Sequence, residues 1–173
     1  MNKFEIHTER TILRKFSGGD LDDLFQVLGH RDVMKYSLTG PYSRDKTSQF
    51  IEKCQSDYEN RGFGLFAVEY RENRKVIGYC GFYYQHIEDQ DEVEIGYRLH
   101  PDYWSRGLAT ETAYAVQDAG FNQYGFNRMI SVIEPENTAS IRVAEKNGME
   151  YEKDVVFKGE VSVRIYMVER DHT

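Results

Sequence analysis

The sequence predicts a mixed α/β fold in which about four helices flank a central sheet of about six to seven strands. Two observations predict it: strand-like and helix-like segments alternate in the second half of the chain, and the last two segments read as a strand hairpin. The chain has 173 residues, 40% hydrophobic and 29% charged, a balance typical of globular domains with a full core. We therefore expect a single domain over residues 1–173.

The first half of the chain contains a strand, two helices and a pair of strands. Asp20 follows two glycines and stands where a residue can cap the first helix, and Ser43 stands at the start of the second. A polar turn at residues 71–74 joins two strand-like runs and predicts a hairpin. The expected elements are a strand over residues 11–16, helices over 20–28 and 43–58, and strands over 63–70 and 76–84.

The second half begins with the clearest strand pattern in the sequence. Apolar residues at 93, 95, 97 and 99 alternate with Glu, Glu, Gly and Arg, which is the period of two expected of a strand. After Gly107 the apolar residues recur at steps of three and four, as in a helix. The expected elements are a strand over 92–99, a helix over 107–125, a strand over 128–134, a helix over 137–147 and strands over 149–157 and 161–168.

Charge and composition exclude several classes of protein. The net charge of −7 argues against a nucleic-acid-binding surface, which needs a basic face, and suits a cationic substrate. No apolar run reaches the length of a membrane span, so we expect no membrane partner. Residues 1–5 do not resemble a signal peptide, so we expect a cytoplasmic protein. His86, His100 and the two cysteines lack metal-type spacing, so we expect no metal.

The segment from Tyr97 to Glu111 predicts an anion-binding turn. A strand ends, a loop follows, and Gly107 opens a helix whose N-terminal N–H groups carry partial positive charge. Gly107 and the small Ala109 let this backbone approach a phosphate closely, and Arg106 adds a cation. The alternative is an ordinary helix start with a permissive glycine. The glycines do not match the patterns of the P-loop or of the dinucleotide fingerprint.

Two motifs resemble those of the GNAT acetyltransferases. Residues 104–111, Trp-Ser-Arg-Gly-Leu-Ala-Thr-Glu, are similar to the family's pyrophosphate motif. Residues 137–149, Asn-Thr-Ala-Ser-Ile-Arg-Val-Ala-Glu-Lys-Asn-Gly-Met, are similar to its Asn-x-x-Ser-x-x-Val-x-Glu-Lys-x-Gly-Phe pattern. Trp104 stands where the wider superfamily usually has Gln or Arg, as is common in the branch of ribosomal-protein N-terminal acetyltransferases. The resemblance covers nearly the whole chain, and it implies the GNAT fold, with its sheet split in a V.

The resemblance implies a site for acetyl-CoA in this split, between the strand that ends at Leu99 and the strand that begins near Arg128. The pantetheine arm would contact backbone groups near residues 98–99, and the pyrophosphate would contact the N–H groups of residues 106–110. Gly96 either forms the family's β-bulge or packs under an aromatic ring. The implied acetyl-CoA-binding residues are Arg98, Leu99, Trp104, Arg106, Gly107, Leu108, Ala109, Thr110, Asn137 and Lys146. Helix capping by Asn137 and solvent exposure of Lys146 are the competing interpretations.

The expected chemistry is direct attack by an amine on the thioester, which requires removal of a proton from the amine. Glu94 is the first candidate for the general base; Glu92 or a water are alternatives, and a solvated acidic hairpin is the competing interpretation. Many family members place a tyrosine where Ala144 stands, so Ser140 is the candidate hydrogen-bond donor to the leaving thiolate. A thiol near its usual acidity can also leave without an acid.

The acceptor has no motif of its own. The branch resemblance favours a protein or peptide α-amine. The alternatives are a small amine such as a polyamine, amino sugar or amino acid, and a module that binds acetyl-CoA without turnover. Family members are monomers or homodimers, and the sequence leaves this choice open.

Overall fold

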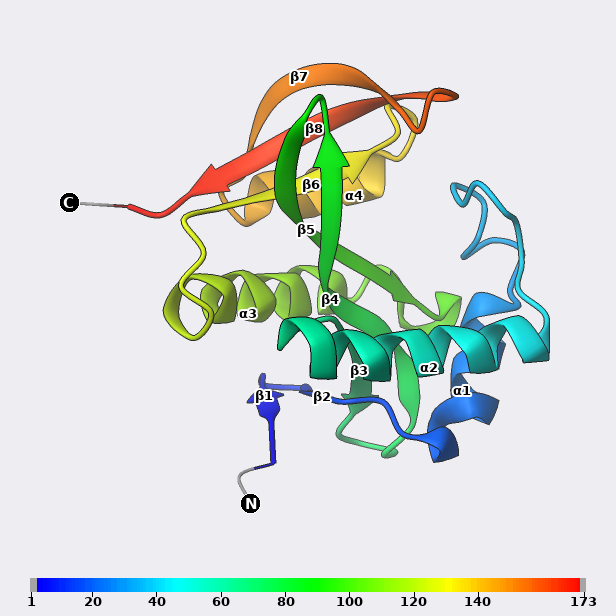
Figure 1. Cartoon of the computed structure of the whole chain (residues 1–173). Helices are drawn as coiled ribbons and strands as arrows, with labels where there is room; N and C mark the ends of the chain where they lie inside the picture. Colours follow the sequence, from blue (N-terminus) through cyan, green and yellow to red (C-terminus); the bar gives the residue numbers. More distant parts are fainter. Residues whose placement is uncertain (1–2, 172–173) are drawn as a thin grey trace.

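The computed structural model describes residues 3–171 and arranges them as one mixed sheet with helices on both faces (Figure 1). This confirms the predicted fold class. Met1 and Asn2, from the stretch that argued against a signal peptide, lie outside the described residues. The strands are β1 (Glu5–His7), β2 (Thr11–Arg14), β3 (Leu65–Tyr70), β4 (Val76–Ile87), β5 (Gln90–Leu99), β6 (Arg128–Ile133), β7 (Glu150–Phe157) and β8 (Val161–Glu169). The helices are α1 (Leu21–Leu28), α2 (Arg44–Arg61), α3 (Leu108–Asn122) and α4 (Thr138–Lys146).

The sheet has eight strands in the order β1-β2-β3-β4-β5-β6-β8-β7, one more than the upper expected number. The additional strand is β1, which has only three residues and pairs with β2. So short a segment shows too little alternation to be predicted as a strand. None of the helices in residues 3–171 combines the length and the apolar character of a membrane span.

The sheet is split between β5 and β6. These two strands are parallel, and their one registered pair joins Glu94 to Ile130. By contrast, β4 and β5 stay in register from Gly78↔Leu99 to Ile87↔Gln90 without a shift. Toward Leu99, β5 therefore has no strand partner on its β6 side, and the sheet opens as predicted.

The buried apolar residues form two clusters. The larger cluster includes Leu13, Phe66 and Val116, and it extends across the split to Met129 of β6 and Tyr166 of β8. In the smaller cluster Ile130, Val163 and Ile165 are almost completely buried. The larger cluster thus joins the two halves of the sheet by shared burial of apolar surface.

Helices cover both faces of the first half. Phe50 of α2 packs against Tyr79, with ring centroids 5.2 Å apart. Gly120 of α3 packs against Phe82, so closely that an added Cβ would lie 3.2 Å from the ring. Tyr79 and Phe82 are three positions apart on β4 and therefore point to opposite faces.

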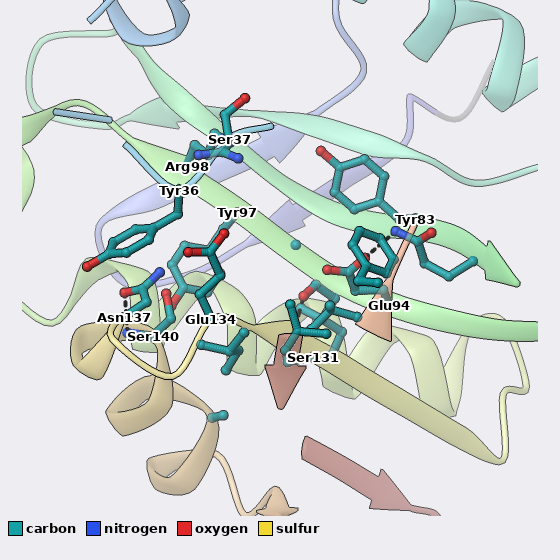
Figure 2. Close-up of a pocket in the computed structure, with 18 of the residues that line it drawn as sticks. Tyr36, Ser37, Tyr83, Glu94, Tyr97, Arg98, Ser131, Glu134, Asn137 and Ser140 are labelled. Atoms are coloured by element: carbon teal, nitrogen blue, oxygen red, sulfur yellow. Dashed lines mark hydrogen bonds between the residues drawn. The ribbon is translucent and has the colours of Figure 1, made fainter. Parts of the chain in front are cut away.

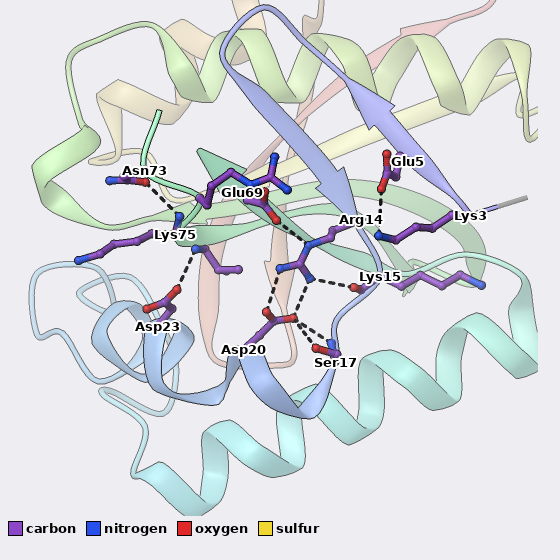
Figure 3. Close-up of polar contacts among 12 residues, drawn as sticks. Lys3, Glu5, Arg14, Lys15, Ser17, Asp20, Asp23, Glu69, Asn73 and Lys75 are labelled. Atoms are coloured by element: carbon purple, nitrogen blue, oxygen red, sulfur yellow. Dashed lines mark hydrogen bonds and ion pairs between the residues drawn. The ribbon is translucent and has the colours of Figure 1, made fainter. Parts of the chain in front are cut away.

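Asp20 does not act as the predicted helix cap. It stands at the N-cap position of α1, but its side chain makes no capping bond to that helix. Instead, its carboxylate binds Arg14 through two contacts of 2.9 Å and accepts a bond of 2.8 Å from the Ser17 N–H (Figure 3). Arg14 also donates to Glu69 on β3 at 2.9 Å. A side chain that the sequence placed in local capping is thus used to attach α1 to the sheet.

Candidate active site

Residues 104–110, called the cofactor turn below, form the start of α3. Gly107 is the N-cap residue, with φ of 78°, and the helix begins at Leu108. An added Cβ at Gly107 would meet only Arg10, at 3.6 Å, so the positive φ rather than lack of space requires glycine here. The N–H groups of the first helical turn have no partner within the helix. The cofactor turn therefore has the donors and the dipole that an anion site requires.

The cofactor turn is held by the N-terminal segment. The carboxylate of Glu111 accepts hydrogen bonds from the Thr8 hydroxyl at 2.7 Å and from the Arg10 N–H and Nε at 3.0 Å each. The Nη1 of Arg10 donates to the Arg106 carbonyl at 2.8 Å. Arg10 thus bridges α3 and the loop before it. This support was not predicted, because it joins residues about a hundred positions apart.

The side chains of the cofactor turn differ in whether they can reach a bound ligand. Leu108 is buried, so only its backbone can reach a ligand. Trp104 donates its indole N–H to the Leu99 carbonyl at 2.8 Å, which fixes the loop to the end of β5. Arg106 is exposed and lies over the Tyr103 ring, 5.3 Å from its centroid. Its guanidinium is free to meet phosphate oxygens.

The predicted Lys146 lies on the same side of the molecule as the cofactor turn. Lys146 is exposed in the last turn of α4. The next residue, Asn147, donates from its side chain to the Thr110 carbonyl at 3.4 Å, which places the end of α4 against the start of α3. Contact of Lys146 with a phosphate remains a prediction.

A cavity of about 360 Å³ lies at the split in the sheet (Figure 2). Its wall combines β4 and β5 on one side with β6, α4 and the turn between β7 and β8 on the other, and residues 36–42 contribute to it. Glu94, Arg98, Asn137 and Ser140 from the predicted set all line it. The structure therefore brings the two predicted catalytic residues into one cavity.

Glu94 is buried on the cavity wall. Its carboxylate accepts a hydrogen bond from the Gln85 amide at 2.7 Å and another from the Val132 N–H. Burial raises the pKa of Glu94 to about 7, although these two hydrogen bonds and the charge of Arg98 lower it in part. A carboxylate with this pKa can accept a proton near neutral pH, as a general base must.

The structure separates Glu94 from the alternative base, Glu92. Both carboxylate oxygens of Glu92 lie 3.1 Å from the Nε of Arg128. The Nη1 of Arg128 donates to Glu152 at 2.7 Å. Glu92 is absent from the cavity wall. Its charge is therefore used in an ion-pair network, and we do not assign it a role in proton transfer.

Of the two interpretations of Gly96, the prediction of a β-bulge is wrong, and packing under an aromatic ring is correct. The pairing of β4 with β5 runs through Gly81↔Gly96 without a register shift. An added Cβ at Gly96 would lie 2.4 Å from the ring of Tyr83, so the ring occupies the place of a side chain. Glycine is required here by close packing against an aromatic residue.

Ser140 and Tyr97 form a pair of hydroxyl groups in the cavity. The Tyr97 hydroxyl donates to the Ser140 Oγ at 3.1 Å. Burial raises the pKa of Tyr97 to about 12, so this hydroxyl stays protonated. Asn137 caps α4 by accepting from the Ser140 N–H at 3.2 Å, which confirms the capping interpretation and fixes Ser140 near Tyr97. The period of two in the sequence predicted the position of Tyr97 in β5, but it could not predict the contact of Tyr97 with Ser140 of α4.

Four polar residues form a group that we call the polar wall: Tyr79, Tyr83, Glu94 and Arg98. All four lie on one face of the β4–β5 pair, because residues 79, 83, 94 and 98 are paired across it. The Arg98 Nε donates to the Tyr79 hydroxyl at 3.0 Å, and the two tyrosine hydroxyls lie 2.9 Å apart. Glu94 was predicted as the general base and Arg98 through its backbone, whereas the two tyrosines and the Arg98 side chain were not assigned. The pairing register of the hairpin is the signal that could have identified them.

Comparisons with known proteins agree with this geometry. The family model described as Acetyltransferase (GNAT) domain matches residues 10–150. The Bacillus subtilis protein YkkB is 37% identical over 154 residues, which cover 88% of this chain and 89% of YkkB. The N-acetyltransferase YnaD of Bacillus subtilis is 31% identical over 147 residues, 85% of this chain and 83% of YnaD. The crystal structure of a GNAT-family acetyltransferase from Bacillus anthracis superposes with a TM-score of 0.81 at 29% identity, covering 96% of this chain and 98% of that one.

Proposed function

The chain belongs to the GNAT acetyltransferase family, and from this premise we propose that it transfers the acetyl group of acetyl-CoA to a small primary amine beside Glu94. One observation carries the proposal: a buried carboxylate with a pKa of about 7 lines a cavity at the split of the sheet. The family premise identifies the reaction as N-acetyl transfer. The position of Glu94 on the cavity wall supports deprotonation of the amine beside this carboxylate.

The residues present fit acetyl-CoA. The cofactor turn offers N–H donors with a helix dipole for the diphosphate, and Arg106 adds an exposed cation. Asn137 and Arg98, the penultimate residue of β5, line the cavity, where the pantetheine arm would lie. Acetyl-CoA supplies the activated acyl group as a thioester.

The proposed reaction uses three side chains. Glu94 takes one proton from the acceptor ammonium, and the amine nitrogen then forms a bond to the thioester carbonyl carbon while the carbon–sulfur bond breaks. The nitrogen loses its second proton, which ends on the departing thiolate, so the products are a neutral amide and the CoA thiol. The Ser140 hydroxyl donates a hydrogen bond to the departing sulfur, and the hydrogen bond that Tyr97 donates to Ser140 orients it. Glu94 releases its proton to solvent after the product leaves.

The size of the cavity supports a small acceptor. The cavity of about 360 Å³ must hold the acetyl end of the thioester as well as the amine, and it is near the lower limit of typical ligand sites. In addition, the Tyr36 hydroxyl donates to the Glu136 carbonyl at 3.3 Å, so the loop before α2 reaches across to the segment before α4. This bridge limits the width of what can enter.

A peptide or protein α-amine is the second candidate. The motif resemblance to ribosomal-protein N-terminal acetyltransferases favours it, and so does the pKa of Glu94, which is close to the value of about 8 of an α-amine. The α-amine of an extended N-terminus can enter a narrow cavity, whereas a folded surface cannot.

Release of the CoA thiol tests the proposal. The protein is incubated with acetyl-CoA and, separately, with polyamines, amino sugars, amino acids and short peptides with free N-termini. We expect thiol release that depends on a small amine. Higher kcat/KM for peptides than for all small amines would replace the first candidate by the second, and binding of acetyl-CoA without thiol release for any acceptor would indicate a non-catalytic module.

A further inference from the structure

Arg98 is a cation on the cavity wall without a carboxylate partner in residues 3–171. Its Nε donates to the Tyr79 hydroxyl, and its Nη1 donates to the Val33 carbonyl at 2.9 Å. Neither acceptor carries a charge. No ion pair joins Arg98 to an Asp or Glu in the described part of the chain, although 29 such residues occur in the sequence. A half-buried guanidinium in an acidic protein normally finds such a partner.

The two hydrogen bonds of Arg98 leave some of its guanidinium N–H groups available to a ligand. A guanidinium has five N–H donors, and the two bonds above use one at Nε and one at Nη1. The remaining donors lie on Nη1 and Nη2, which together form the end of the fork that binds a carboxylate through two parallel hydrogen bonds. Arg98 lines the cavity together with the hydroxyl-bearing Ser37 (Figure 2). Thr39, which also carries a hydroxyl, is another lining residue.

The polar wall thus has opposite charges at its two ends. Glu94 and Arg98 lie on the same face of β5, four residues and about 13 Å apart along the strand. Gly96, between them on β5, has no side chain, and the ring of Tyr83 from β4 occupies this place, so the hydroxyl end of Tyr83 belongs to the surface that joins the two charges. Glu134 also lines the cavity, and no side-chain bond to its carboxylate occurs in residues 3–171.

We propose that the acceptor carries a carboxylate in addition to its amine, and that the free end of the Arg98 guanidinium binds this carboxylate while Glu94 receives the amine. The inference rests on the proposed function and narrows the acceptor to the class of amino acids. Of the two charged ends of the wall, Arg98 attracts a carboxylate and an ionised Glu94 repels one, so the anionic end of the acceptor lies at the Arg98 end. The only other cation on the cavity wall within the described residues is Lys158, which is exposed and therefore more strongly screened.

The test compares acceptors that differ only in this carboxylate. The probes are glycine, the other standard α-amino acids and the ω-amino acids from β-alanine to 6-aminohexanoate, each with its primary amide, and spermidine as an amine without an acid group. We expect the best acid to have a KM at least tenfold below that of its amide. In Arg98→Met, the KM of the acid rises at least tenfold while that of the amide changes less than twofold.

Two variants and one binding measurement separate a specificity role from a structural one. Arg98→Lys keeps the charge without the fork and should recover part of the preference, and Lys158→Met should retain all of it. If the wild type uses amides or spermidine as well as acids, or if Arg98→Met impairs acids and amides equally, Arg98 serves only to hold the loop at Val33, and the inference is wrong.

The binding measurement keeps this inference distinct from the proposed function. Calorimetric titration of the same acids and amides into the protein saturated with CoA requires no turnover. Acid-selective, Arg98-dependent binding without thiol release would preserve the carboxylate site and reject the acetyl transfer. Thiol release without selectivity for acids would preserve the transfer and reject the carboxylate site, and the absence of both would reject both.

Discussion

The cofactor turn and the polar wall represent two ways of building a binding site. The cofactor turn consists of consecutive residues whose backbone N–H groups face outward at a helix start, and one positive-φ glycine is enough to form it. The polar wall consists of side chains from two strands, and Gly96 gives the ring of Tyr83 its place. A backbone site suits a ligand that is the same throughout a family, whereas a side-chain site can change with the acceptor.

The largest expected effect is at the polar wall, from Glu94→Gln. Because a positioned general base contributes about a hundredfold or more, kcat/KM for the best acceptor should fall by at least this factor. The Kd for acetyl-CoA should stay within twofold, since the cofactor turn is separate. Steady-state kinetics and calorimetry measure the two values. The matched control is Glu92→Gln, which removes a carboxylate of the same strand outside the cavity and should keep most of the activity.

The same substitution should change the pH dependence of stability. The pKa of Glu94 is raised from 4.5 to about 7. The contribution of its protonated form to the free energy of unfolding is therefore fully present below pH 4.5 and is lost as the pH rises through 7. Relative to Glu94→Gln, the wild type should therefore lose up to about 3 kcal/mol between these limits. Urea unfolding at pH 5 and pH 8 measures this. Parallel pH profiles for the two proteins would show that Glu94 is ionised as readily as an exposed carboxyl.

At the cofactor turn, Gly107→Val should weaken acetyl-CoA binding about tenfold or more, because a side chain and a strained backbone would replace the surface that meets the diphosphate. The matched control is Gly125→Val. Gly125 has a similar φ of 70° and open space around it, but it lies beyond the far end of α3. Both variants should lose similar stability, and only Gly107→Val should lose affinity. Undiminished affinity in a folded Gly107→Val protein would reject the cofactor turn as the diphosphate site.

The smallest expected effects concern the thiolate. Ser140→Ala and Tyr97→Phe each remove one member of a hydrogen-bonded pair, so kcat should fall about three- to tenfold while the Kd for acetyl-CoA stays nearly constant. Thr138→Ala, an exposed residue in the same first turn of α4, should have no effect. Equal turnover in Ser140→Ala and the wild type would remove Ser140 from the mechanism.

Most of the features that could be predicted from the sequence, the helices, strands and helix starts, follow from local patterns. The period of two predicted β5 and the glycine at 107 predicted the start of α3, and the expected helices and strands match within a few residues. The split of the sheet was implied by the family resemblance. Capping by Asn137 is likewise local and is confirmed.

The remaining features depend on contacts between distant segments. Asp20 binds Arg14 and the Ser17 N–H instead of capping α1, and its bond to Arg14 is a charge-assisted pair between segments that no local pattern reveals. The position of Tyr83 over Gly96 depends on the register of a hairpin, which its turn sequence did not determine. The partners of Arg98 include Val33, which no strand or helix pattern could place.

The single registered pair between Glu94 and Ile130 also has a mechanical consequence. The two halves of the sheet meet at this pair, and Arg128 links β5 to β7 there through its ion pairs. A ligand bound in the opening contacts both halves, so it should stabilise the folded sheet against unfolding. Glu94, the proposed general base, belongs to this pair and also to the pair with Tyr83, so its backbone is held by the strands on both sides.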